Sequence, residues 1–301
     1  MSWAQTDAVA RSISSEITFD ELVKSIRDSF SSPDSIAKCA YFWIAENIEY
    51  DYKTLQNGAI DIDSFWVRNS FEQVVLTKTA VCAGYTSLFQ QILTECGVES
   101  VAINGTSRQG RDFTGDYILK EDHAWNAYKS ENRWNLVDVT WASTTKENNK
   151  VSTFYFQTDP KVFVVSHYPS NTEWQLLDTA LTYSQFKESI YVNYRYFEIG
   201  LGNLPPRINR NGNKIQLLFD YHDYWRPKVY EFHDTTLKEV TQTLDADSVR
   251  LTTSLTFEVG SNDLIKIEAN WIGWGNIVFM NYPEIGFLKI NKKEITGAKN
   301  P

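Results

Sequence analysis

The sequence is poor in cysteine, in basic tracts and in long apolar runs. Its three cysteines are too few, and odd in number, for a scaffold stapled by disulfides. No apolar run approaches the roughly 20 residues of a membrane-spanning helix, so we expect no membrane span. The 29 lysines and arginines against 38 aspartates and glutamates give a net charge of −9, and we therefore expect no nucleic-acid partner.

Aromatic side chains, in contrast, are abundant. They make up 14% of the 301 residues, a content that favours strands and a large core. The apolar share of 42% and the charged share of 22% are those of a globular protein. This length allows one large domain or two ordinary ones.

Helical patterns dominate the first hundred residues. The capping box Thr18-Phe19-Asp20-Glu21 predicts one helix start, and Ser32-Pro33 predicts another. A further helix is predicted from about Ala83 to Glu95. Residues 53–70 and 104–121 are predicted to be long loops.

The pattern then changes to the period of two that is typical of strands. Strands are predicted over residues 99–103, 123–129 and 134–141 and, after a Gly- and Pro-rich boundary at 200–206, over 214–222, 228–233, 250–259, 263–271 and 276–281. We therefore expect an α+β protein, with helices packed on an antiparallel sheet over residues 1–200. A small all-β, sandwich-like (Ig-like) domain is expected over residues 205–301.

Cys82 immediately precedes the predicted helix that starts near residue 83. Its sulfur would lie at the free N–H groups and the positive dipole end of that helix, where a thiolate is favoured. The next residues, Ala83 and Gly84, are small and are expected to let a substrate backbone approach. Cys82 is therefore a candidate nucleophile.

His123 and Asp138 are candidate partners for Cys82. A tight turn centred between Glu131 and Asn132 pairs residues whose numbers sum to 131 + 132 = 263, which places Asp138 opposite Trp125. His123 is then the diagonal neighbour of Asp138 on the same face, with Cβ atoms roughly 7–8 Å apart. A thiolate, an imidazole and a carboxylate together are the groups that acyl transfer through a thioester requires.

Taken singly, these residues have ordinary structural interpretations. Cys82 suits a core, His123 a hydrogen-bonded histidine, and Asp138 a turn or cap aspartate. Cys39 and Cys96 are interpreted as buried residues that could pair if the protein is exported. The small-x-small pattern Ser2-Trp3-Ala4 favours export slightly.

Three separated motifs resemble the core of the transglutaminase-like superfamily. They are Thr79-Ala80-Val81-Cys82-Ala83-Gly84-Tyr85-Thr86, Asp122-His123-Ala124-Trp125-Asn126 and Trp134-Asn135-Leu136-Val137-Asp138-Val139-Thr140-Trp141. The resemblance implies a papain-related α+β fold in which Cys82, His123 and Asp138 form the catalytic triad. Segments within residues 154–177 further resemble the kyphoscoliosis-peptidase-type branch.

The sequence therefore predicts a cysteine-dependent peptidase or amidase that acts on a protein or peptide substrate. The alternatives are a non-catalytic binding or assembly module with the same fold, and a transglutaminase that transfers the acyl group to an amine. No cofactor or metal is expected, since His222 and His233 have no third ligand. His167 and Trp66 are interpreted as packing residues, and the oligomeric state stays open.

Overall fold

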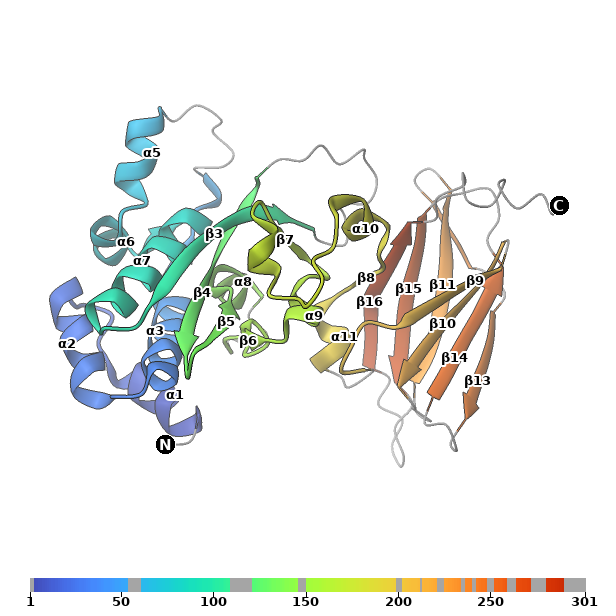
Figure 1. The fold of residues 1–301 in the computed structure, drawn as a ribbon, viewed down its shortest axis with the longest axis horizontal. Helices are drawn as coiled ribbons and strands as arrows, with labels where there is room; N and C mark the ends of the chain where they lie inside the picture. The colour runs from blue at the N-terminus through green and yellow to red at the C-terminus, as the bar shows by residue number, and fades with distance from the viewer. Residues whose placement is uncertain are drawn as a thin grey trace. The chain divides into compact units, whose positions relative to one another are not determined.

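The computed structural model describes residues 3–53, 61–108, 121–145, 150–198, 202–211, 213–220, 225–233, 236–239, 242–247, 252–258, 264–271 and 280–289. The chain folds into two compact units (Figure 1). Unit 1 contains residues 1–106, 120–160 and 169–176, and unit 2 contains residues 107–119, 161–168 and 177–301. The predicted boundary at residues 200–206 therefore falls inside unit 2. Within the described ranges, the helices are all too short or too polar to pass through a membrane.

The helices of unit 1 begin where the sequence supplies caps. They are α1 (Trp3–Ser12), α2 (Phe19–Ser29), α3 (Pro33–Asn47), α5 (Ile62–Arg68), α6 (Phe71–Thr77), α7 (Cys82–Glu95), α8 (Val139–Thr144) and the 3-10 helix η2 (Thr172–Gln175). The predicted capping box of Thr18 and Glu21 is confirmed, as is the start of α3 at Pro33 after the cap Ser32. The prediction of a loop over residues 53–70 is wrong where α5 forms, because Asp61 caps that helix with its carboxylate.

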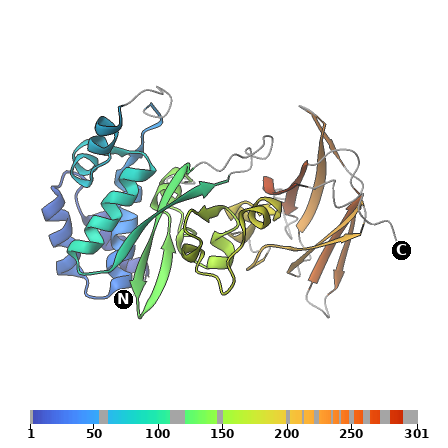
Figure 2. The same cartoon turned by 45° about the horizontal axis from the view of Figure 1, so that its top comes forward.

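A five-stranded sheet has the strand order β6-β5-β4-β3-β7, and all of its residues except Ser107, His167 and Tyr168 belong to unit 1. Its strands are β3 (Ser100–Ser107), β4 (His123–Ser130), β5 (Arg133–Val137), β6 (Phe156–Thr158) and β7 (His167–Pro169). The helices α3 and α7 lie along one face of β3, β4 and β5 (Figures 1 and 2). A short parallel pair, β1 (Glu49–Tyr50) and β2 (Thr79–Ala80), leads into α7. The largest fully buried side chains of this unit are aromatic, such as Trp43, Trp125 and Tyr85.

The predicted hairpin register is confirmed. Asn126 lies opposite Val137 and Ser130 opposite Arg133, so the paired numbers sum to 263. The turn residues Glu131 and Asn132 both have positive φ, which matches the twist of the two strands. The prediction that this strand continues to Trp141 is wrong, because β5 ends at Val137 and α8 begins at Val139, with Asp138 as its N-cap.

Unit 2 contains α9 (Pro160–Phe163, whose first residue belongs to unit 1), α10 (Tyr183–Glu188) and α11 (Tyr194–Glu198). Its strands form two antiparallel sheets, of order β13-β14-β10-β9 and β12-β11-β15-β16-β8. The strands are β8 (Tyr191–Val192), β9 (Arg207–Asn211), β10 (Lys214–Asp220), β11 (Trp225–His233), β12 (Thr236–Glu239), β13 (Gln242–Asp247), β14 (Thr252–Glu258), β15 (Leu264–Trp271) and β16 (Met280–Lys289). His222 and residues 276–279 lie outside the described residues. The α+β fold class is confirmed.

Candidate active site

Cys82 is the first helical residue of α7, one position earlier than the pattern predicts. The preceding residue, Val81, occupies the N-cap and makes no side-chain capping bond. The backbone N–H groups of Gly84 and Tyr85 donate to the carbonyl oxygen of Val81 at 2.8 and 3.2 Å, which closes the first turn. The backbone N–H of Cys82 is therefore one of the N–H groups at the helix start that have no carbonyl partner within the helix.

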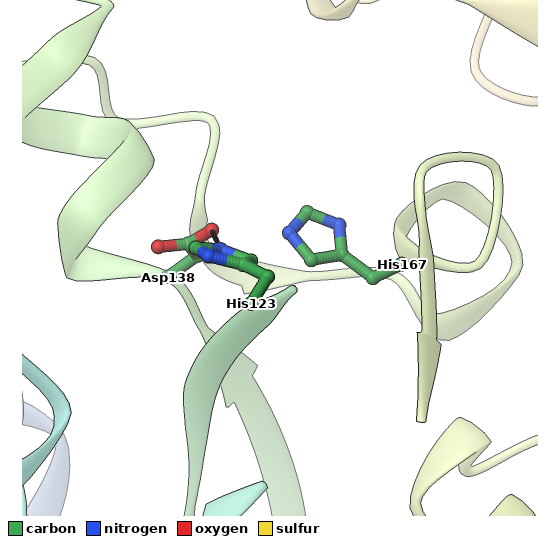
Figure 3. Close-up of side chains that lie close together, drawn as sticks. All are labelled: His123, Asp138 and His167. Atoms are coloured by element: carbon green, nitrogen blue, oxygen red, sulfur yellow. Dashed lines mark hydrogen bonds and ion pairs between the residues drawn. The ribbon is translucent and has the colours of Figure 1, made fainter. Parts of the chain in front are cut away.

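His123 and Asp138 form a buried pair, as Figure 3 shows. Nε2 of His123 lies 2.7 Å from Oδ2 of Asp138, and the two side chains are 5% and 0% exposed. The other carboxylate oxygen, Oδ1, accepts the backbone N–H of Trp141 at 2.9 Å and so caps α8. Asp138 thus contacts the imidazole from a position one residue beyond Val137, the last residue of β5 that pairs with β4.

The surroundings favour the charged form of His123. Burial alone lowers the pKa of this imidazole, but the charge and hydrogen bond of Asp138 act in the opposite direction. A hydrogen bond and charge attraction from the side chain of Cys82 add to that increase, and the pKa of His123 is raised above its ordinary value. Cys82 and Asp138 therefore act on the same ring.

Aromatic rings shield this pair from water. The ring of Trp141 stacks on His123 with centroids 5.4 Å apart, and Tyr155 meets Trp141 edge-on at 5.5 Å. Trp141 belongs to the third sequence motif, but its stacking on His123 could not be inferred from spacing. Such a covered pair keeps its electrostatic attraction, which bulk water would weaken.

Tyr50, at the end of β1, is a neighbour of the site that the sequence analysis missed. Burial raises the pKa of its phenol, and the nearby Cys82, Tyr52 and Asp138 raise it further. The phenol is therefore neutral near both the thiol and the carboxylate. Nothing in the sequence singles out Tyr50, because its approach to Cys82 depends on the pairing of β1 with β2.

Side-chain amides hold the elements of the site together. Nδ2 of Asn126 donates to the carbonyl oxygens of Thr86 in α7 and Val101 in β3, at 3.2 and 3.3 Å. Oδ1 of Asn69 accepts the N–H of Val81 at 3.1 Å. Asn126 belongs to the second sequence motif, whereas Asn69 stands in a segment that was predicted to be a loop.

Two sequence-based interpretations near the site are wrong. Gly84 does not open a path for substrate, because it is buried, and a Cβ there would lie 2.8 Å from Cβ of Ala80 and from Oδ1 of Asn69. Trp66 is not packed inside, since 59% of its surface is exposed on α5.

The structure also gives the surroundings of His167, Cys39 and Cys96. His167, also drawn in Figure 3, is buried in strand β7, and within unit 2 it stacks on Phe163 at 4.0 Å, as expected of a packing residue. Cys39 and Cys96 are not paired with each other, because all three cysteines are free. Burial raises the pKa of Cys39 to about 12 and also raises that of Cys96. Both thiols are thereby kept protonated.

The chain is similar to proteins of known families. Residues 20–139, which include Cys82, His123 and Asp138, match the model of the transglutaminase-like superfamily. Kyphoscoliosis peptidase is 31% identical over 213 residues in Mus musculus and 30% identical over 213 residues in Homo sapiens. Each of these alignments covers 66% of this chain and 30% of the relative.

A more distant relative and one solved structure can also be aligned with parts of this chain. The Lim and transglutaminase domain protein ltd-1 of Caenorhabditis elegans is 24% identical over 204 residues, which are 61% of this chain and 27% of that protein. The chain thus spans less than a third of the length of these relatives. A structure described as "Crystal structure of a TGase" aligns with a TM-score of 0.34 and 15% identity, over 50% of this chain and 35% of that one.

Proposed function

Because this chain belongs to the transglutaminase-like superfamily through its residues 20–139, we propose that it is a cysteine-dependent enzyme acting on peptide or amide carbonyls. The observation that carries the proposal is the buried ion pair of His123 and Asp138, together with the hydrogen bond between His123 and the side chain of Cys82. A thiol at the start of a helix, an imidazole and a carboxylate supply a nucleophile, an acid–base group and its orienting partner.

The first step forms the thioester. The Cys82 sulfur, as thiolate, attacks the carbonyl carbon, and the negative charge that develops on the oxygen is stabilised by the free N–H of Cys82. The carbon–nitrogen bond then breaks, and protonated His123 gives its proton to the departing amine. Asp138 stabilises the imidazolium and fixes which ring nitrogen faces it, since Oδ2 accepts from Nε2.

The second step releases the acyl group. Neutral His123 takes a proton from a water molecule, which attacks the thioester and displaces the Cys82 sulfur as thiolate. The product is a carboxylic acid, and the proton returns His123 to its charged form. An amine in place of water would give a new amide, which is the reaction of a transglutaminase. We propose hydrolysis as the main reaction, with proteins or peptides as substrates. Export stays a prediction from the N-terminal pattern alone.

The test is turnover by the full chain on a panel of peptides, with and without a primary amine. Cys82→Ala should reduce turnover by at least about 1,000-fold, because no other group can form the thioester. Cys96→Ala is the matched control and should leave turnover unchanged, since Cys96 lies beyond the other end of α7.

The pattern of products distinguishes the alternatives. Free acid as the product, whether or not amine is added, is expected. A product that is mostly the new amide would replace hydrolysis by amine transfer. Equal turnover by wild type and Cys82→Ala, or none by either, would contradict the enzyme proposal and favour a binding module.

A further inference from the structure

Asn69 lies where α5 ends and is held at both ends of its amide group. It is the C-cap residue of α5, is only 5% exposed, and donates from Nδ2 to the carbonyl oxygen of Phe65 at 2.9 Å. Its Oδ1 accepts the N–H of Val81 at 3.1 Å, across twelve residues of chain. The two bonds together fix the orientation of the amide, because a reversed amide would bring an NH₂ group against the N–H of Val81.

The oxygen of Asn69 also lies in a closely packed place. A Cβ on Gly84, in the first turn of α7, would lie 2.8 Å from Oδ1 of Asn69 and 2.9 Å from Cγ2 of Val74. Only a glycine at position 84 lets the helix approach the amide this closely. Asn69 and the first turn of α7 therefore define each other's position.

The bond from Val81 to Asn69 matters because Val81 is the residue before Cys82. Val81 is buried and its apolar side chain cannot cap the helix, so the start of α7 lacks the usual capping bond from its own N-cap residue. The amide of Asn69 instead binds the backbone of the N-cap residue from outside. This bond fixes the Ala80–Val81 peptide group, one residue before the peptide group that carries the Cys82 N–H, and so restrains the backbone from which the Cys82 side chain projects.

We propose that Asn69 is a positioning residue for the Cys82 nucleophile. The inference rests on the proposed function, since it assigns Asn69 a part in the same reaction without contact with the substrate. Loss of the Val81 bond would leave the α7 start free to shift. A misplacement of about 1 Å at a reacting group is sufficient to slow a reaction by about 100-fold.

The chain offers a matched control in Asn47. This residue ends α3, and its Nδ2 donates to the carbonyl oxygen of Trp43, four residues earlier, at 2.8 Å. This hydrogen bond is of the same kind as the one from Nδ2 of Asn69 to the carbonyl oxygen of Phe65. Asn47 does not bind the backbone before Cys82. Asn47→Ala therefore removes the local helix-end bond alone, whereas Asn69→Ala removes that bond and the one to Val81.

The experiment compares Asn69→Ala, Asn69→Asp and Asn47→Ala in the full chain. It measures kcat and KM on one peptide, and the rate at which iodoacetamide alkylates Cys82 at neutral pH. Asn69→Ala should lower kcat by about 100-fold with little change in KM and should also change the alkylation rate, because the nucleophile rather than the binding surface is displaced. Asn69→Asp keeps an acceptor for the N–H of Val81, so its kcat should stay within about tenfold of the wild-type value.

The outcomes separate this inference from the proposed function. A folded Asn69→Ala protein with wild-type kcat and a wild-type alkylation rate would overturn the inference, as would an equal loss in Asn47→Ala. If Asn69→Ala does not fold, Asn69→Asp decides, and a kcat reduced by about 100-fold although the acceptor for Val81 is kept contradicts the inference. If the wild type itself has no turnover, the proposed function fails, while the alkylation rates still show whether Asn69 controls the reactivity of Cys82.

Discussion

The Asp138 carboxylate is bound at both oxygens, by His123 on one side and by the backbone of Trp141 on the other. The alternating pattern Val137-Asp138-Val139 predicts a continuing strand, yet aspartate is also a preferred N-cap residue. In the structure the capping preference prevails, and the chain turns into α8. The same cap fixes the carboxylate facing His123. The interpretation of Asp138 as a cap and its pairing with His123 are therefore both correct.

The pair should make stability depend on pH. The pKa of His123 is raised to about 10, whereas an unfolded histidine titrates near 6.5. A raised pKa means that the stabilisation is fully present below about pH 6.5 and is lost as the pH rises toward 10. Asp138→Asn should lower the free energy of unfolding by about 3 kcal/mol at about pH 6, and by clearly less at about pH 9.5, as measured by urea unfolding.

Asp34→Asn is the control for that experiment. Oδ1 of Asp34 binds the hydroxyl of Tyr128 and the amide of Gln157, and no histidine. Its effect on unfolding should therefore not decline over the same pH interval. An Asp138→Asn effect that stays constant between the two pH values, or grows with pH, would contradict a stabilising charge on His123.

At the scale of elements, α7 carries the site because other elements hold its first turn. Asn126 binds α7 from β4, Asn69 binds the residue before it, and Gly84 packs on Asn69 and Ala80. The sequence predicts α7 and the hairpin register well, since apolar spacing and turn chemistry are local signals. It does not predict α5, whose exposed Ile62, Trp66 and Val67 give no buried face to detect.

Substitution of Gly84 tests how tightly this first turn is packed. Gly84→Ala should lower the free energy of unfolding by about 1–3 kcal/mol, because the added methyl group overlaps Ala80, Asn69 and Val74. Gly97→Asn is the comparison. Gly97 has φ +77 with nothing within 4 Å, and asparagine tolerates that conformation, so the cost should stay below about 1 kcal/mol. Equal costs in thermal unfolding of the two variants would contradict close packing at Gly84.

At the scale of the whole molecule, the two units are not continuous in sequence. The chain enters unit 2 at residues 107–119 and 161–168 before it stays there from Leu177. The amino-acid composition predicts a domain boundary only near residue 200, where glycines and prolines cluster, because these residues indicate local flexibility of the chain. Returns of the chain between units depend on contacts between distant residues, such as those of buried Arg108 with the carbonyl oxygens of Val165 and Phe186. No local pattern encodes them.

The most direct measurement is alkylation of each cysteine across a range of pH, with mass spectrometry to resolve Cys39, Cys82 and Cys96. Cys82 should react fastest over the whole range, and His123→Gln should slow its alkylation by at least about tenfold, because the imidazole no longer acts on the sulfur. Cys39 and Cys96 should react slowly, because burial raises their pKa values. A Cys82 rate no greater than the rates of Cys39 and Cys96, or one that is unchanged in His123→Gln, would contradict the nucleophile and its imidazole partner.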